Sequence, residues 1–71
     1  MDNLQIFTLR LNELLSDKNM SAYALTRALD IPHSTAQAWF VGKSFPTVDY
    51  LIKLAKFFNC SIDYLVGITN Y

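Results

Sequence analysis

The residue types that carry catalytic or metal chemistry are scarce in this chain. It has one histidine, His33, one cysteine, Cys60, and one glutamate, Glu13. Metal sites and activated nucleophiles need several such groups at set spacings. The sequence contains no paired cysteines or histidines, no glycine-rich phosphate loop and no Ser/His/Asp arrangement. We therefore expect no enzyme activity, no bound metal and no cofactor.

Hydrogen-bonding side chains gather instead within residues 32–41. His33, Ser34 and Gln37 lie one and four residues apart, so they share one face of a helix. The same segment has an apolar face made of Ala36, Trp39 and Phe40. Such a helix is anchored by its apolar face and presents its polar face outward, which suits recognition rather than catalysis.

Apolar periodicity and capping residues predict four further short helices around this segment. The expected ranges of all five are about 4–18, 21–29, 32–41, 48–58 and 62–66. The expected N-caps are Ser21, Thr47 and Ser61, while Pro32 presets φ for the third helix. The helices are expected to end at residues that tolerate a left-handed backbone better than most. These residues are Asp30, Gly42, Asn59 and Gly67.

The same periodicity predicts which side chains point inward. In the first helix these are Leu4, Phe7, Leu11 and Leu14, and in the second Ala24, Leu25, Ala28 and Leu29. The predicted inward stripe of the fourth helix is Val48, Leu51, Ile52, Ala55 and Phe58. Cys60 is expected to fill a gap in the core as a small hydrophobe.

Composition bounds the class of protein. Seventy-one residues suffice for one domain, and 52% hydrophobic residues with two Gly and two Pro favour a dense helical core over disorder or an all-β fold. The absence of a signal-like N-terminus and of a membrane-length apolar run predicts a cytoplasmic protein without a membrane partner. The net charge of +0 and pI of about 6.5 leave function open, because most nucleic-acid-binding domains are basic.

A short second helix, a tight turn and a third helix of about ten residues are typical of the helix-turn-helix unit. The sequence therefore predicts an all-α, compact five-helix bundle, with one domain over residues 1–71 and the helix-turn-helix unit at about 21–41.

Motifs along nearly the whole chain resemble the phage-repressor-like helix-turn-helix family of the Xre or Cro type, whose fold is lambda-repressor-like. The segment 39–42 has its W-x-x-G pattern, 42–49 is similar to its G-K-x-x-P-[ST] element, and 58–67 is similar to its closing L-G-V-S-x-D-Y-L-x-G. Other matching positions are Leu11, Leu14, Met20, Ser21, Leu25, Leu29 and Ile31.

The resemblance implies a sequence-specific DNA-binding regulator of the repressor kind. It places the helix 32–41 in the major groove of double-stranded DNA and the second helix across the backbone. The implied base contacts are His33, Ser34, Gln37 and Ala38. The implied backbone contacts are Ser21, Tyr23, Lys43 and Ser44. This chemistry fits, because Gln pairs bidentately with adenine and Lys neutralises phosphate.

The resemblance also implies a homodimer, at least on DNA. Family members use the C-terminal region for dimer contacts, which corresponds here to Tyr64, Ile68 and Tyr71. A two-fold dimer places two recognition helices about 34–36 Å apart, one turn of DNA, and doubles the basic contacts of a neutral monomer.

Several positions depart from the family pattern, notably Ala22, Thr26, Asp30 and Ala36. Many relatives hold a partly buried Arg–Glu ion pair at the positions of Leu15 and Phe40. Replacing both charges by apolar groups can be neutral or stabilising, whereas losing one costs about 3–5 kcal/mol. We therefore expect Leu15 to pack on Phe40.

A second hypothesis is a protein-interaction module on the same fold, which binds an antirepressor-type or toxin partner as a protein regulator and binds DNA weakly or not at all. The neutral charge, Ala22 and Ala38 favour it. The location of charge separates the two. DNA binding predicts that Arg10, Arg27 and Lys43 flank the helix 32–41 and that the acidic residues Asp17, Asp49 and Asp63 lie away from it.

Overall fold

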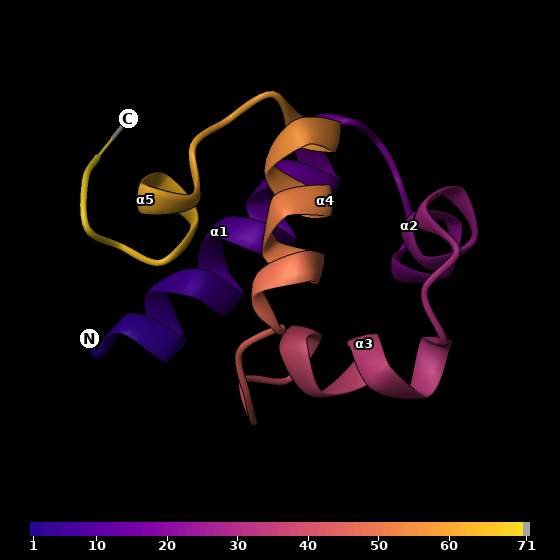
Figure 1. Ribbon diagram of the computed structural model, residues 1–71, viewed down its shortest axis with the longest axis horizontal. Coiled ribbons are helices and arrows are strands. Elements are labelled where there is room, and N and C mark those ends of the chain that lie inside the picture. Colours follow the sequence, from indigo (N-terminus) through magenta and orange to yellow (C-terminus); the bar gives the residue numbers. More distant parts are fainter. Residues whose placement is uncertain (71) are drawn as a thin grey trace.

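The computed structural model describes residues 1–70 and is all-helical there, with no strand. The five helices are α1 (Asn3–Asp17), α2 (Ala22–Leu29), α3 (His33–Phe40), α4 (Val48–Phe58) and α5 (Ile62–Leu65), as Figure 1 shows. The predicted fold class is confirmed, and the predicted helix boundaries are correct to within one or two residues. No helix within residues 1–70 is long and apolar enough to cross a membrane.

Four of the helices begin with a side-chain cap. Ser21, Thr47 and Ser61 accept hydrogen bonds from the backbone N–H three residues on, as predicted. Asp2 caps α1 in a reciprocal arrangement with Gln5 that the sequence analysis did not identify. These caps satisfy N–H groups that a helix cannot pair internally.

All five helices end by the same backbone device. A residue with positive φ follows each helix, at Asn19, Asp30, Gly42, Asn59 and Gly67. The residue after it then donates its N–H to the carbonyl five residues earlier in the chain. The first of these hydrogen bonds runs from Met20 to Leu15 and the last from Ile68 to Asp63. This is the Schellman arrangement, which turns the chain sharply and pairs carbonyls at the helix end. Four of the five positions were predicted as stops, and Asn19 was missed.

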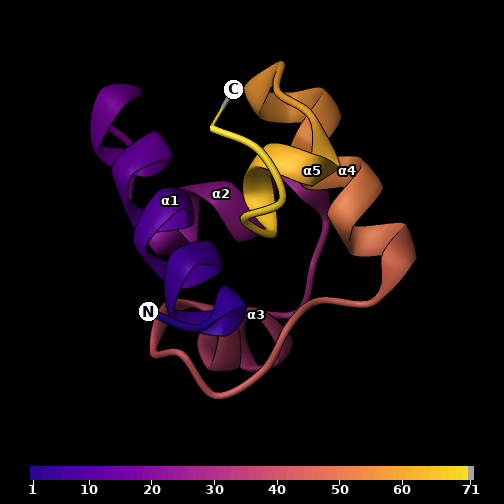
Figure 2. The ribbon, with the colours of Figure 1, turned by 90° about the vertical axis from the view of Figure 1, so that its left-hand side faces the viewer.

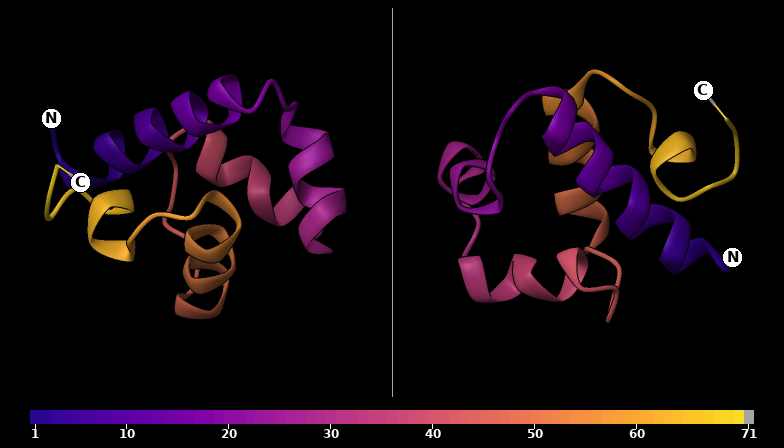
Figure 3. Two further views of the ribbon diagram at one scale, coloured as in Figure 1. Left: turned by 90° about the horizontal axis from the view of Figure 1, so that it is seen from above. Right: turned by 180° about the vertical axis from the view of Figure 1, so that it is seen from behind.

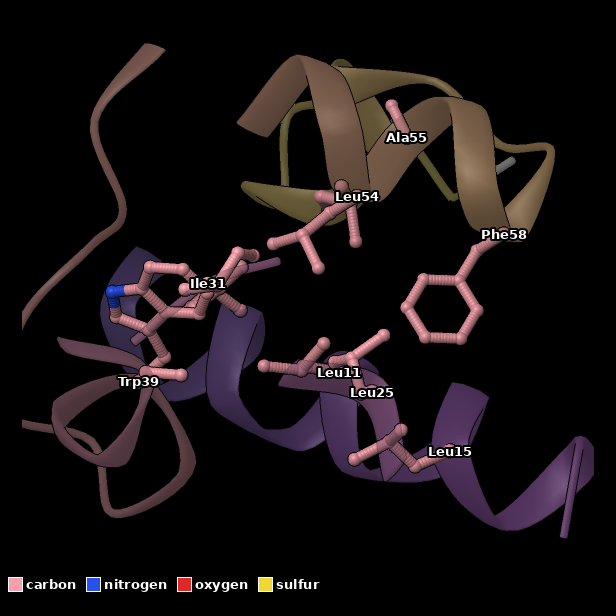
Figure 4. Close-up of a cluster of buried hydrophobic side chains, with 11 residues drawn as sticks. Leu11, Leu15, Leu25, Ile31, Trp39, Leu54, Ala55 and Phe58 are labelled. Atoms are coloured by element: carbon pink, nitrogen blue, oxygen red, sulfur yellow. The ribbon is translucent and has the colours of Figure 1, made fainter. Parts of the chain in front are cut away.

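The helices enclose one apolar core, drawn in Figure 4. Phe7, Leu11, Leu25, Leu54 and Leu65 are its largest fully buried side chains. Leu54 and Phe58 of α4 point toward side chains of α1 and α2 (Figure 4). The core also contains Leu15, Ile31, Ala36, Trp39 and Ala55, and Cys60 packs against it.

The inward face of α4 differs from the predicted one. Val48 is 68% exposed and Ile52 is 38% exposed, whereas Leu54 is fully buried. The prediction for Val48 and Ile52 is therefore wrong, as is the prediction that Ala28 of α2 points inward, because Ala28 is exposed. Apolar residues occupy two neighbouring faces of α4, and periodicity alone cannot choose between them. The contacts with α1 and α2 favour the face of Leu51, Leu54, Ala55 and Phe58.

The hypothesis about Leu15 and Phe40 stays a prediction. Leu15 is 5% exposed, and the partly buried Phe40 packs against the same core. The Asn12 amide, less than one turn from Leu15, lies 3.4 Å from the Phe40 carbonyl. The C-terminal half of α1 and the end of α3 are therefore neighbours. A direct contact between the Leu15 and Phe40 side chains stays a prediction.

α3 lies along one edge of the molecule, at the bottom in Figures 1 and 2. It packs on α1 and α2, while α5 packs on α1 and α4. The two views of Figure 3 show α2 and α5 at opposite ends of α1. The helix-turn-helix unit therefore forms one end of the molecule and the C-terminal segment the other.

Candidate nucleic-acid interface

α3 has one face in the core and one face open to solvent. Ala36 is fully buried and Trp39 is 2% exposed, so these two side chains anchor the helix. His33, Ser34 and Gln37 are all exposed. The predicted inward position of Ala36 and Trp39 and the outward position of His33, Ser34 and Gln37 are confirmed, whereas Ala38, predicted to point outward, packs against the core.

Two polar side chains of α1 fix the C-terminal turn of α3. The Thr8 hydroxyl donates to the Trp39 carbonyl at 2.9 Å, and the Asn12 amide donates to the Phe40 carbonyl at 3.4 Å. The Trp39 ring also meets Tyr50 of α4 with 5.5 Å between centroids. α3 is thus held by two other helices, which preorganises its outward face.

The turn between α2 and α3 fixes the angle at which α3 leaves the core. Asp30 takes the left-handed conformation, with φ 54° and ψ 49°, and Ile31 is buried beside it. Thr26, one of the predicted departures from the family pattern, is 3% exposed and donates its hydroxyl to the Tyr23 carbonyl. A buried hydroxyl that finds a carbonyl within its own helix costs little, so this departure leaves the packing intact.

The N-terminus of α3 lacks the side-chain cap that the other helices have. Pro32 occupies the N-cap position and makes no side-chain hydrogen bond. The Thr35 and Ala36 N–H groups donate to the Pro32 carbonyl, which leaves the His33 and Ser34 N–H groups without a side-chain cap at an exposed helix end. Such an end attracts negative charge, through free N–H donors and the helix dipole.

Aromatic contacts join α2 to the start of α3. The Tyr23 and His33 rings meet edge to face with 6.0 Å between centroids. The Arg27 guanidinium lies 5.7 Å from the centroid of Tyr23. Tyr23 is 58% exposed, so this row of one cation and two rings lies on the surface.

The remaining predicted backbone contacts border the same face. Lys43 and Ser44 are exposed in the loop after α3, where the Lys43 N–H is bonded to the Ala38 carbonyl at 2.8 Å. Ser21 uses its oxygen to cap α2, which leaves its O–H able to donate to a phosphate. Ala38 is partly buried and packs against the core, so it presents less surface than the polar residues of α3.

A comparison with known protein families matches residues 11–65 to the family described as helix-turn-helix. This stretch includes all of the core residues except Phe7, and it includes α2, α3 and the loop that follows α3. The chain belongs to the Xre and lambda-repressor type of helix-turn-helix family. The domain is therefore a DNA-binding regulatory one, and the family is not an enzyme family. Comparisons with curated proteins and with solved structures give no significant match.

DNA binding predicts that the basic residues of this helix-turn-helix domain flank α3, and only some of them do. Lys43 follows α3 directly, and Arg27 lies near its start. Arg10, however, does not flank α3. Its guanidinium donates to the Tyr64 and Thr69 carbonyls, so that prediction is wrong.

The acidic residues divide in a similar way. Asp17 ends α1 and Asp63 lies in α5, both away from α3 (Figures 1 and 2). Asp49 lies in the first turn of α4, directly after the loop that borders α3. Asp30 is also exposed, in the turn directly before α3, so Asp30 and Asp49 offset the charges of Arg27 and Lys43 around the outward face of α3.

The residues predicted for a dimer have different environments. Ile68 is 69% exposed, whereas Tyr64 is partly buried and its ring is covered by Arg10 at 4.3 Å. Tyr71 lies outside the described residues. Ile68 is thus the accessible apolar side chain of this group within residues 1–70.

The structure adds two exposed residues to α3 and its end, Thr35 and Val41, that the sequence analysis did not select as DNA contacts. Arg27, which was predicted to flank the helix, joins this surface through Tyr23. A signal was present for Val41, because it follows Gln37 by one helical turn.

Proposed function

We propose that this protein is a sequence-specific transcriptional repressor that inserts α3 into the major groove of double-stranded DNA as a homodimer. The observation that carries the proposal is the outward face of α3. His33, Ser34 and Gln37 are exposed there, on a helix fixed by contacts to α1 and α4. A rigid helix with short polar side chains at its N-terminal end has the form that reads base edges.

The proposed contacts divide between bases and phosphates. Gln37 can pair with N6 and N7 of adenine, and Ser34 with either kind of base edge. Lys43, Ser44, Ser21 and the uncapped start of α3 surround these side chains with phosphate-binding groups. Tyr23 and His33 support each other through their ring contact, so we place them together at the edge of the groove.

Dimerisation compensates for the weak charge of one domain. With a formal net charge of +0, a single domain neutralises few phosphates and gains little affinity from counterion release. Two domains on adjacent half-sites double these contacts and the sequence that is read. Repression follows from occupancy alone, since a bound dimer excludes other proteins from its site.

This proposal is tested by selecting the sequences that the protein binds from a pool of random duplex DNA. The selection is done at a fixed salt concentration of about 0.1 M. We expect enrichment of an inverted repeat whose half-site centres lie about one DNA turn apart. A reporter gene placed downstream of that sequence should be repressed by the protein. Lack of any enrichment, even at low salt, would refute sequence-specific binding.

Gln37→Ala tests the base contact directly. The expected loss is about 1–3 kcal/mol of binding to the selected sequence, with relaxed preference at one base pair. Thr35→Ala is the matched control, because Thr35 is exposed on the same helix but has no proposed contact. Equal losses for both variants, or an unchanged base preference in Gln37→Ala, would contradict the assignment.

A protein-interaction module remains the second candidate. The observation that favours it is the charge distribution, since the exposed Asp30 and Asp49 lie near α3 as well as Arg27 and Lys43, while Arg10 is committed to the C-terminal segment. The same selection separates the two candidates, because this alternative predicts no enriched sequence.

A further inference from the structure

A second surface of the molecule is built like a binding site. A hollow of about 420 Å³ is lined by Ala28, Leu29, Lys53, Lys56 and Phe57. These residues come from the C-terminal half of α2 and from α4, and α3 contributes none of them. The floor is apolar, and the rim carries ammonium groups.

The rim gathers half of the basic residues of the chain, which has six. Lys53 and Lys56 line the hollow itself. The Lys18 ammonium, from the end of α1, lies 5.4 Å from the centroid of Phe57. The end of α1 and one face of α4 therefore direct positive charge to one small area, and α2 adds apolar surface.

These charges are not neutralised inside the described part of the chain. Lys53 donates to the Leu29 carbonyl at 3.2 Å and lies 5.8 Å from the Tyr50 ring, while Lys18 faces Phe57. Within residues 1–70 none of the three lysines forms an ion pair with a carboxylate. Three like charges held close together without counter-charges leave a site of positive potential.

We propose that this hollow binds an acidic amphipathic segment of a partner protein. One apolar side chain of that segment rests on Ala28, Leu29 and Phe57, and carboxylates beside it meet Lys53, Lys56 and Lys18. An apolar ligand alone would leave the three charges unpaired, and a bare anion would leave the floor uncovered. An amphipathic segment with apolar and acidic residues one turn apart satisfies both.

The position of the hollow allows this partner to bind while α3 holds DNA. Phe57 and Lys56 belong to the C-terminal end of α4, which lies at the opposite end of the molecule from α3 in Figure 1. The proposal therefore goes beyond DNA binding and does not depend on it. If the proposed function holds, the partner bound there could act on the protein while α3 is in the groove.

Titration of the ¹⁵N-labelled full chain with synthetic peptides tests the proposal. The probe is a helical peptide with leucines at i, i+3, i+4 and i+7 and glutamates elsewhere. Its matched control has lysine in place of every glutamate. We expect the acidic peptide to shift the amide signals of Leu29, Lys53 and Phe57, and the basic peptide to leave them unchanged.

Charge reversal then tests the rim. Lys18→Glu combined with Lys56→Glu should weaken binding of the acidic peptide about tenfold or more. Both side chains are exposed, so the fold is retained, which the spectrum of the variant checks. Ala28→Gln, also at an exposed position, should crowd the floor without adding a charge that could pair with the lysines. Lys43→Glu is the matched control and should leave peptide binding unchanged.

Three results would overturn the proposal. Equal shifts with the acidic and basic peptides would mean non-specific apolar contact. Shifts of the same amides by a short DNA duplex, weakened by the Lys18 and Lys56 reversals as much as by Lys43→Glu, would make the hollow part of the nucleic-acid surface. Concentration-dependent shifts of these amides without any peptide would identify a second copy of the chain as the occupant.

Discussion

Lys43 and Arg10 show how one kind of charge serves two purposes in this domain. Lys43 is exposed in the loop that follows α3, with only its backbone N–H engaged. Arg10 is committed to the C-terminal segment, where it meets two carbonyls, the Asn70 side-chain oxygen and the Tyr64 ring. Of these two residues, Lys43 is therefore the one that is available to a phosphate.

Lys43→Ala should reduce the salt dependence of DNA binding by about one unit in the slope of log K against log salt. The reason is that one fewer counterion is released when the protein binds. Fluorescence anisotropy over a series of salt concentrations measures the slope. Lys56→Ala, at the far end of α4, is the control and should leave the slope unchanged. A change of equal size in both variants would mean that Lys43 acts only through net charge.

Cys60 is a partly buried thiol, and burial raises its pKa above the ordinary value. The folded chain therefore keeps the thiol protonated at a pH where the unfolded chain ionises it. The stability linked to this group is fully present at pH values below the ordinary pKa of a thiol. It is lost as the pH rises through the higher pKa that Cys60 has in the folded chain.

This linkage can be measured by comparing the wild-type protein with Cys60→Ala. The free energy of unfolding should fall more steeply with rising pH for the wild type, from about pH 8 upward. Urea unfolding at several pH values gives both curves, and the difference between them removes the contribution of tyrosines and lysines. Parallel curves would show that the thiol is as well solvated in the folded chain as in the unfolded one.

At the scale of the elements, the ends of the helices determine how the chain is folded around α1. Gly42 and Gly67 both have positive φ, at 82° and 84°. A Cβ on Gly42 would meet only the Thr8 side chain, at 3.6 Å or more. A Cβ on Gly67 would lie 3.1 Å from side-chain atoms of Asn3 and Ile6. The C-terminal turn is thus pressed against α1, where the Asn3 amide also donates to the Val66 carbonyl at 2.7 Å.

Alanine substitution should separate these two constraints. Gly42→Ala should cost about 1–2 kcal/mol of unfolding free energy, from backbone strain alone. Gly67→Ala should cost more, because strain is joined by crowding against α1. Chemical denaturation of both variants provides the comparison. If both variants lose the same unfolding free energy, the side chains of Asn3 and Ile6 move aside without an energetic cost. The close packing of this turn would then be unimportant for stability.

At the scale of the whole molecule, the proposed recognition helix α3 and the proposed dimer residue lie on different parts of the surface. Ile68 is 69% exposed in the C-terminal segment, well apart from α3 (Figure 1). A contact there between two copies would leave both recognition helices open. The proposal of a homodimer on DNA therefore predicts that a change at Ile68 affects the cooperativity between two domains but not the DNA contacts of one domain.

Ile68→Asp should weaken binding to a two-half-site DNA while leaving binding to a single half-site unchanged. The reason is that a charge in an apolar interface is costly, whereas DNA contacts by α3 are unaffected. Leu9→Asp is a matched control, since Leu9 is also an exposed apolar residue, at 45%. Gel-shift titrations with both DNAs give the two affinities. Unchanged cooperativity in Ile68→Asp would place the dimer contact elsewhere.

The sequence by itself determined the helices, most of their caps and stops, and the two faces of α3. These features depend on residues within one or two turns of each other. Ser21 caps the N–H of Ala24, Asp30 tolerates the left-handed turn, and the buried Ala36 and Trp39 fix the orientation of α3. Local hydrogen bonding and helical periodicity are sufficient to predict them.

Only the tertiary structure decided which face of α4 is buried, where Arg10 binds, and which lysines gather around Phe57. Leu54 replaced Val48 and Ile52 in the core because α1 and α2 pack on that face. Arg10 meets residues 54 to 60 positions away in the chain. Such choices depend on the packing of helices remote in sequence, and an amphipathic pattern records only that a helix has an apolar side.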